Sequence, residues 1–351
     1  MADPVLLGVD SFVARVTDPS SGREIGPEER FEHLLEEIAL ADRVGLHSYG
    51  IGEHHRSEYY DAAPPVILAA AAARTERIRL RSAVTVLSAA DPVRVFQEFA
   101  TIDLISRGRV DLVVGRGSFV EAFPLFGLAF EDYDELFTEK LDLLLKINES
   151  PVVTWSGKHR PALTNQPVYP RPAQERLPIW VGVGGTPESF ARAGLLGLPL
   201  MIAIIGGEPK QFAPLVDLYR RAGEHAGHPP EALRVGLHCF GFLGDDVAKA
   251  TNSFYPGWEE MFTTVAAERG GMPPTRRAFD AMRGPDGAFF VGDPRTVAEK
   301  VLRVSEQLGG VERINLQMTN PRLAHEDLLH SIELLGTQVA PFVEKGQTSP
   351  S

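Results

Sequence analysis

The chain has 351 residues, of which 44% are hydrophobic and 23% charged, a composition typical of a globular protein with a sizeable core. Its formal net charge of −12, without a long basic run, argues against a nucleic-acid partner, because neutralising phosphates requires clustered Lys and Arg. The single cysteine, Cys239, leaves no intrachain disulfide, and no window of 18 apolar residues predicts a membrane span, so we expect a cytoplasmic protein.

Apolar runs and amphipathic segments alternate along the chain. Strands are expected at 5–9, 47–52, 78–86, 110–114, 179–183, 199–204, 233–243 and 313–318. Helices are expected at 27–44, 65–74, 92–106, 133–147, 187–195, 208–226, from 246 onward, and at 326–339. Asp91 followed by Pro92 is a good example of a helix start, because Asp caps the free N–H groups and Pro suits the first turn.

Eight strands separated by helical segments predict parallel pairing and an α/β fold. Eight such units favour a single (β/α)8 TIM barrel over residues 1–344, followed by a flexible tail at 345–351. An open, doubly wound sheet is the alternative.

Two insertions interrupt this rhythm, after the fourth and seventh strands. The first includes the Pro-rich segment 150–178, which is expected to form a short hairpin or a surface excursion. The second covers 253–288, where pairs of Gly and Pro indicate a long irregular loop. Barrel active sites are built by loops on this side, so the second insertion is either a lid or a passive excursion.

The expected second strand ends in Gly52, Glu53, His54 and His55. Adjacent side chains on a strand point to opposite faces, so only one of the two histidines faces a common site. An acid and an imidazole at a barrel mouth can perform general acid–base chemistry near neutral pH. No third ligand has clear spacing, so a metal site is not predicted, and plain polar residues on the rim are the alternative.

The next two strand ends carry further candidates. Ala83 and Val84 are small enough to let a flat ring approach the backbone, although core packing explains them equally well. Arg116 is flanked by two glycines and followed closely by Ser118. Its planar guanidinium matches a phosphate group, and a salt bridge to a nearby carboxylate is the alternative.

The fifth strand runs into the sequence GVGGTPES at 182–189. Gly184 and Gly185 expose backbone N–H groups, Thr186 is expected to cap the following helix, and Ser189 lies in its first turn. Free N–H groups at a helix N-terminus bind phosphate readily. A tight turn before a capped helix is the alternative.

Several short motifs together resemble the bacterial luciferase-like monooxygenases, a (β/α)8 superfamily of flavin-dependent enzymes. The resemblance covers most of the chain, and its motifs follow one another in the right order. They are EHH at 53–55, ADPVR at 90–94, SRGR at 106–109 leading to RG at 116–117, GLP at 197–199, and TQVAPF at 337–342.

The resemblance implies a role for each candidate residue. Glu53 lies near the flavin, and His54 is the catalytic histidine, acting close to the flavin C4a position. Ala83 and Val84 form a non-prolyl, often cis peptide under the isoalloxazine ring, and Arg116 grips the FMN phosphate. The residues implied to bind FMN are Ala83, Val84, Arg116, Ser118, Gly184, Gly185, Thr186 and Ser189.

Two positions depart from the luciferase pattern. Gly115 stands where luciferase has a reactive Cys, which argues against light emission from a long-chain aldehyde. Gly185 stands where luciferase has a Glu, which suggests that backbone groups dominate the phosphate cradle.

The resulting hypothesis is a monooxygenase that takes reduced FMN from a separate flavin reductase. Reaction with O2 would give a C4a-hydroperoxide that oxidises an organic small molecule. An F420-dependent hydride-transfer enzyme on the same barrel is the first alternative, favoured by the basic residues Arg276, Arg277 and Arg283. A non-catalytic flavin-binding protein is the second, and a metal-dependent hydrolase is a distant third. The Ala-rich helix at 65–74 matches the dimer region of the family, so a homodimer is expected.

Overall fold

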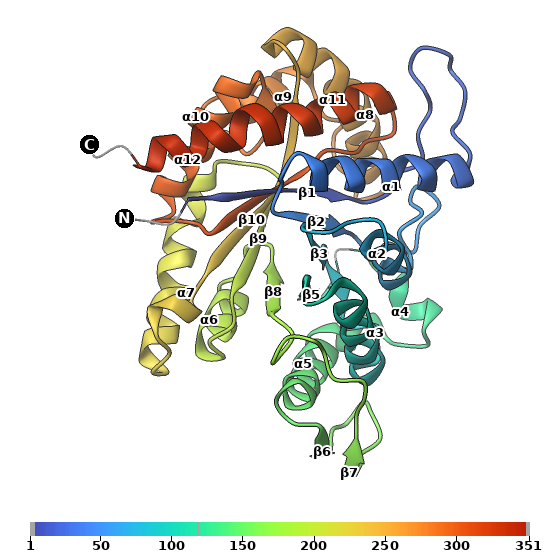
Figure 1. Cartoon of the computed structure of the whole chain (residues 1–351), viewed down its shortest axis with the longest axis vertical. Helices are drawn as coiled ribbons and strands as arrows, with labels where there is room; N and C mark the ends of the chain where they lie inside the picture. Colours follow the sequence, from blue (N-terminus) through green and yellow to red (C-terminus); the bar gives the residue numbers. More distant parts are fainter. Residues whose placement is uncertain (1–3, 118, 349–351) are drawn as a thin grey trace.

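Eight parallel strands form a closed barrel at the centre of the protein (Figure 1). This computed structural model describes residues 4–117 and 119–348. The barrel strands are β1 (Leu6–Ser11), β2 (Ser48–Ile51), β3 (Arg79–Ser82), β5 (Val110–Gly115), β8 (Ile179–Val183), β9 (Leu200–Ile204), β10 (Val235–Leu243) and β12 (Arg313–Gln317). They pair in that order, and β12 pairs with β1, so the ring is complete. The TIM barrel is therefore confirmed, and the open sheet is wrong.

The third strand is shorter than expected and is interrupted. Residues 78–86 were expected to be one strand, but β3 ends at Ser82 and a separate strand, β4 (Thr85–Val86), resumes the pairing with β5. Ala83 and Val84 lie between the two pieces, and the peptide bond that joins them is cis. The cis geometry that the family resemblance implied is confirmed.

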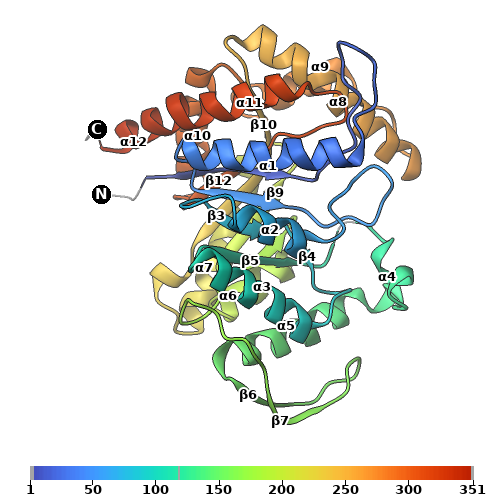
Figure 2. The ribbon, with the colours of Figure 1, turned by 45° about the vertical axis from the view of Figure 1, so that its right-hand side comes forward.

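Helices cover the outside of the barrel (Figure 2). They are α1 (Pro27–Arg43), α2 (Pro64–Ala72), α3 (Pro92–Ser106), α5 (Tyr133–Glu149), α6 (Pro187–Leu195), α7 (Ala213–His225), α10 (Pro294–Gln307), α11 (His325–Leu334) and α12 (Ala340–Thr348). Each buries an apolar stripe, as α1 does with Leu34, Ile38 and Ala41. The expected helix start at Asp91 is confirmed, because its carboxylate accepts hydrogen bonds from the N–H groups of Val93 and Arg94.

The insertion after β5 contains a short helix, a long helix and a hairpin. The short helix α4 (Ala122–Leu125) leads through a 3-10 turn (Phe130–Asp132) into α5. Strands β6 (Val152–Trp155) and β7 (Leu163–Pro167) then pair antiparallel, as expected for 150–178. This hairpin projects from the bottom of the molecule in Figure 1 and Figure 2.

The irregular loop expected at 253–288 is wrong, because most of that segment is helical. Helix α8 (Val247–Glu268) runs through it, and α9 (Arg276–Arg283) follows. Pro256 lies on the exposed side of α8, while Phe254 and Trp258 are buried beneath the helix. Burial of these aromatic side chains outweighs the loss of one helix hydrogen bond at proline. The Gly and Pro pairs lie outside the helices, between α8 and α9 and after the end of α9.

Two further elements before the last strand were missed. A short strand, β11 (Phe290–Gly292), pairs with the end of β10, and α10 follows it. The start of α10 repeats the signal seen at α3, because the Asp293 carboxylate accepts hydrogen bonds from the N–H groups of Arg295 and Thr296.

Ion pairs fill the barrel interior near the N-terminal ends of the strands. Asp111 is buried and forms salt bridges of 2.6 Å with Arg79 and with Arg313. The Arg313 guanidinium also stacks 4.1 Å from the centre of the Trp180 ring. Burial alone would raise the pKa of Asp111, but the two arginines lower it to about 2. These ion pairs and the Trp180 ring fill the barrel at the N-terminal ends of its strands. A binding site is therefore expected at the C-terminal ends of the strands.

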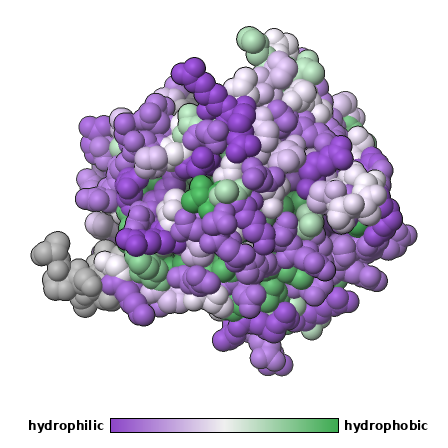
Figure 3. Space-filling view, turned by 90° about the horizontal axis from the view of Figure 1, so that it is seen from above, coloured by the Kyte–Doolittle hydropathy of each residue, from purple (hydrophilic) through white to green (hydrophobic). Residues whose placement is uncertain are grey.

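The outer surface over α8 to α12 is largely hydrophilic when seen from above (Figure 3). Helix α12 continues to Thr348, past the start of the tail expected at 345. Among the helices of residues 4–117 and 119–348, none is long and apolar enough to cross a membrane.

Candidate active site

His54 lies just beyond the end of β2 and is held by a buried carboxylate. Its ring nitrogen Nδ1 is 2.8 Å from Oδ2 of Asp61, and its backbone N–H donates to Oδ1 of the same residue at 3.1 Å. Asp61 is fully buried, and this burial raises the pKa of its carboxyl group above the ordinary value. Because Nδ1 is occupied by Asp61, Nε2 is the nitrogen available for chemistry.

Aromatic rings surround the His54 imidazole. The ring centres of Phe12 and Tyr59 both lie 4.6 Å from that of His54, and Phe119 lies 5.5 Å away. Tyr59 and Phe119 also line a narrow cavity of about 40 Å³, whose other walls include Met261 of α8. The imidazole therefore faces largely apolar surroundings.

Glu53 bonds to a different set of neighbours from His54. Its Oε2 accepts a hydrogen bond of 2.8 Å from the backbone N–H of Val86, and its Oε1 lies 3.2 Å from Nε2 of His55. The hydrogen bond to Glu53 raises the pKa of His55. Glu53 thus ties the end of β2 to β4, while His54 turns toward Asp61.

The Val84 side chain packs between two glycines. A Cβ at Gly115 would lie 2.7 Å from Cγ2 of Val84, and a Cβ at Gly182 would lie 2.8 Å from its Cγ1. Both distances are too short for real atoms, so neither position accepts a side chain without displacing Val84. The close approach of Val84 gives a physical reason for a glycine at position 115, the position at which luciferase carries a Cys.

Arg116 follows β5 and uses only part of its guanidinium within the chain. Its Nη1 pairs with Asp134 and donates to the Tyr133 hydroxyl at 3.2 Å. The salt bridge that was the alternative for this residue is therefore present. Its Nε and Nη2 make no hydrogen bond with residues 4–117 or 119–348, so these two nitrogens remain available to an anion.

The N-terminus of α6 is open. Thr186 is the N-cap residue, as expected, but its side chain accepts no capping hydrogen bond. Gly184, Gly185 and Thr186 are exposed, and no described atom beyond its chain neighbours lies within 4 Å of a Cβ built on Gly184. Ser189 is buried. The backbone of Gly184, Gly185 and Thr186 is therefore accessible at this helix end, while the N–H of Ser189 donates to the Thr186 carbonyl at 3.0 Å.

The parallel pairing brings most of these segments together. His54, Ala83 and Val84, Arg116, and Gly184 follow the strands β2, β3, β5 and β8. Those four strands are consecutive neighbours in the barrel, so their carboxyl ends lie side by side on one rim. Ser118, the remaining candidate, lies outside the described residues.

Sequence reasoning missed Asp61 and the aromatic rings around His54. Asp61 stands seven positions after its partner in a loop, where no periodicity or motif marks it. A buried acid beside a candidate histidine is a strong sign of function, but burial of a loop residue is visible only in the folded chain.

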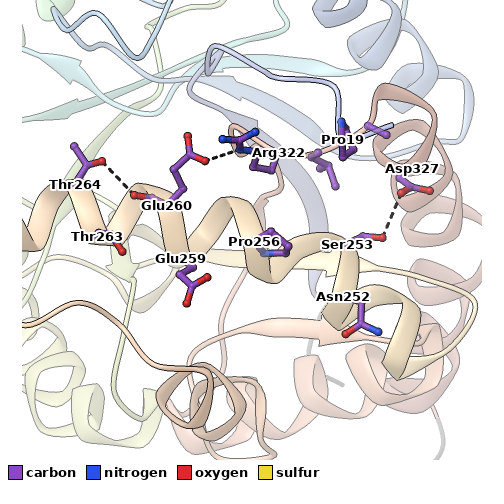
Figure 4. Close-up of a pocket in the computed structure, with 12 residues that line it drawn as sticks. Pro19, Asn252, Ser253, Pro256, Glu259, Glu260, Thr263, Thr264, Arg322 and Asp327 are labelled. Atoms are coloured by element: carbon purple, nitrogen blue, oxygen red, sulfur yellow. Dashed lines mark hydrogen bonds and ion pairs between the residues drawn. The ribbon is translucent and has the colours of Figure 1, made fainter. Parts of the chain in front are cut away.

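A larger groove lies beside α8 and not at the strand ends. It has a volume of about 820 Å³ and is lined by Pro19, by one side of α8 and by residues 322–324 and Asp327. Figure 4 shows that Arg322 pairs with Glu260 and that Ser253 bonds to Asp327 across it. Thr264 lines both this groove and the narrow cavity at Tyr59. The histidine fixed by Asp61 lies at the rim and does not line this groove.

Comparisons with known proteins identify the family of the chain. Residues 11–312 match the family described as luciferase-like monooxygenase. A protein from Escherichia coli, also described as a luciferase-like monooxygenase, is 24% identical over 339 residues, covering 92% of this chain and 93% of the relative.

Solved structures share the fold. Monooxygenase RslO1 from Streptomyces bottropensis superposes with a TM-score of 0.83 at 24% identity, covering 96% of this chain and 99% of the other. The oxygenating constituent of 3,6-diketocamphane monooxygenase from Pseudomonas putida, solved with FMN, gives 0.75 at 21%, with coverage of 97% and 99%. An F420-dependent secondary alcohol dehydrogenase gives 0.74 at 18%, with the same coverage. Because the family match spans most of its length, the chain belongs to the luciferase-like monooxygenase family.

Proposed function

We propose that this protein is a flavin-dependent monooxygenase that uses reduced FMN and O2 to oxidise an organic small molecule. One observation carries the proposal. One rim of the barrel carries four features on consecutive strands. They are a histidine fixed by a buried carboxylate, a cis peptide, an arginine with free guanidinium nitrogens, and an open helix N-terminus.

The residues on this rim fit a phosphorylated, planar cofactor. Arg116 and the α6 N–H groups would hold the phosphate, because a guanidinium fork and a helix N-terminus both favour a dianion. Ala83 and Val84 would support the ring. The Thr85 hydroxyl beside them is buried and has no hydrogen-bond partner among the described residues, so a polar edge of the ring would satisfy it.

Reduced FMN, when bound, supplies the electrons that activate O2. The chain's own contribution is orientation and proton management. Asp61 fixes His54 through Nδ1, so Nε2 can hold or release a proton at the substrate. Phe12, Tyr59 and Phe119 pack around the His54 ring and would limit the access of water to it.

A hydride-transfer enzyme that uses F420 is the second candidate. It is favoured by the fold shared with the F420-dependent alcohol dehydrogenase and by the arginines on α9. Arg276 and Arg283 both pair with Asp280, which leaves less positive charge for the acidic tail of F420.

The proposed partners follow from the proposed reaction. Reduced FMN would come from a separate flavin reductase, and the location would be cytoplasmic, where the buried thiol of Cys239 stays reduced. A homodimer would cover the exposed apolar side chains Val66 of α2 and Leu104 and Ile105 of α3. Light scattering of the V66R/I105R double variant should then report a monomer, while the wild type reports a dimer.

Titration with FMN, riboflavin and F420 tests the proposal. We expect FMN to bind, and we expect R116A to weaken FMN about 10- to 100-fold, the effect of losing a charge-assisted bond, with riboflavin affinity unchanged. Equal losses for FMN and riboflavin would refute the phosphate contact, and binding of F420 alone would establish the second candidate.

The role of His54 needs an activity measurement. H54A should retain FMN affinity but lose substrate-dependent O2 uptake in the presence of reduced FMN. FMN binding without any substrate-dependent O2 uptake in the wild type would instead indicate a non-catalytic flavin-binding protein.

A further inference from the structure

A second histidine in the barrel interior is held by a carboxylate in the same manner as His54. His238 lies on β10, and its Nδ1 is 2.6 Å from Oδ2 of Asp10 on β1. Asp10 is fully buried and also accepts hydrogen bonds of 2.5 and 2.6 Å from Nη2 of Arg81 on β3. Three strands thus contribute one residue each to a fixed imidazole.

Charge distinguishes the two histidines. Asp10 already has a cation partner in Arg81, and Nδ1 of His238 is its second hydrogen-bond partner. Burial would raise the pKa of Asp10, but Arg81 and His238 outweigh it and hold that pKa below its ordinary value. Asp61, by contrast, has no cationic partner besides His54 among the described residues.

In the tautomer whose Nδ1–H donates to Asp10, Nε2 of His238 carries a lone pair. This nitrogen forms no hydrogen bond with any described residue, although the side chain retains some exposed surface. The nitrogen is therefore free to accept a hydrogen bond from a ligand.

Phe12 places the two histidines beside one another. Its ring stacks on His238 with centres 5.7 Å apart, and it also packs 4.6 Å from the centre of His54. The two imidazoles are therefore no farther apart than these two distances combined. They flank one aromatic ring, and Tyr59 and Phe119 continue the apolar lining.

We propose that His238 is a second substrate-contacting residue, whose Nε2 accepts a hydrogen bond from a hydroxyl group on a flat, largely apolar substrate of the phenol type. The inference deepens the proposed function, because it assigns a substrate class to the same site. Aromatic side chains favour the flat apolar part, and the lone pair of His238 selects the hydroxyl group.

An N–H group of the bound cofactor could supply the same donor chemistry, so the test must separate the two sources. The probes are 2-naphthol and its methyl ether, 2-methoxynaphthalene, which differ in one donor hydrogen. Their dissociation constants are measured by calorimetry without cofactor and again with FMN.

The variants separate the proposed ligand contact at Nε2 of His238 from its structural contact with Asp10 at Nδ1. H238N keeps an amide N–H near the Nδ1 position, to bond Asp10, but removes the acceptor at Nε2. H238Q places its amide near the Nε2 position instead. H330N is the matched control, because His330 pairs with Asp245 at 2.6 Å on the outer surface.

We expect the wild type and H330N to bind 2-naphthol about tenfold more tightly than the ether, the value of one well-formed hydrogen bond. H238N should lose this preference, and H238Q should keep part of it. Equal affinity of the wild type for both probes, or a preference that survives in H238N, would overturn the proposal. A preference lost alongside FMN affinity in H238N would assign the contact to the cofactor.

A measurement on the wild type keeps the proposal testable if H238N does not fold. In protein labelled with 15N-histidine, the Nε2 signal of His238 should shift on addition of 2-naphthol and stay in place with the ether. Absence of that shift would overturn the proposal. Failure of the proposed function would look different, because FMN would then not bind while the naphthol preference persisted.

Discussion

Asp61 binds His54 twice, through the ring nitrogen and through the backbone N–H, and so fixes both the position and the tautomer of the imidazole. The two contacts together require two acceptor oxygens, which a carboxylate provides. An amide at this position has one acceptor oxygen and one donor group, and the donor would face Nδ1–H or the backbone N–H.

We therefore expect D61N to lower turnover about 100-fold, within the range that general acid–base groups contribute, while FMN affinity stays unchanged. Steady-state kinetics and FMN titration of the variant check this. D245N is the control, since Asp245 pairs with His330 on the surface. Wild-type turnover in D61N would remove Asp61 from the mechanism.

The sequence predicted those candidate residues that directly follow a strand. It did not predict Asp61, which reaches the site from a loop. His54, Ala83, Val84 and Arg116 each follow a recognisable strand, so topology alone brings them to one rim. Asp61 reaches His54 only through the path of a loop, which has no periodic signal.

At the scale of elements, Arg56 connects three segments around the mouth of the barrel. Its guanidinium pairs with Glu58 and Glu121 at 2.7 Å and also with Glu268, at the end of α8. It lies 4.6 Å above the Phe119 ring, which in turn packs on His54. One side chain thus fastens α8 and the α4 segment over the histidine.

Replacing Arg56 by Ala should free the end of α8. Hydrogen exchange measured by mass spectrometry should rise about tenfold in residues 262–275. In the variant, local unfolding of this segment no longer has to break the ion pairs of Arg56, so it costs less free energy. R295A is the matched control, since Arg295 pairs with Glu299 on an exposed helix face. Unchanged exchange in R56A would show that packing alone holds α8 in place.

Helix α8 also shows where sequence reasoning failed on an element. The Gly and Pro pairs suggested a loop, yet Phe254, Trp258 and Phe279 belong to one buried aromatic cluster that holds α8 and α9 as helices. Local propensity was overruled by tertiary burial, which is invisible until the partners of those rings are known. The eight-fold barrel was predictable because eight separate apolar runs, alternating with helical segments, all indicate the same fold.

Stability of the whole molecule should depend on pH through Lys300. This residue of α10 is buried, and its Nζ donates to the carbonyls of Gly284 and Phe289 at 2.7 and 2.6 Å. Burial lowers its pKa to about 7, from the model-peptide value of 10.5. Two short hydrogen bonds match the two N–H groups of a neutral amine.

Between pH 7 and pH 10.5, the unfolded chain holds a proton on this lysine that the folded chain does not. The unfolding free energy should therefore rise with pH across this interval, by on the order of 1 kcal/mol per unit from Lys300 alone. Urea denaturation of the wild type and of K300M at pH 7, 8 and 9 measures the difference. Parallel pH dependence in the two proteins would contradict the prediction.

Phe12 packs against two imidazoles, and this position affects how the site responds to mutation. Any substitution at this ring alters the support of both histidines, so its effects will not add to those of changes at His54 or His238. Laboratory evolution toward a new substrate will accordingly meet strong epistasis at this position. Libraries that vary Phe12 together with its neighbours will reach functional combinations that successive single steps do not.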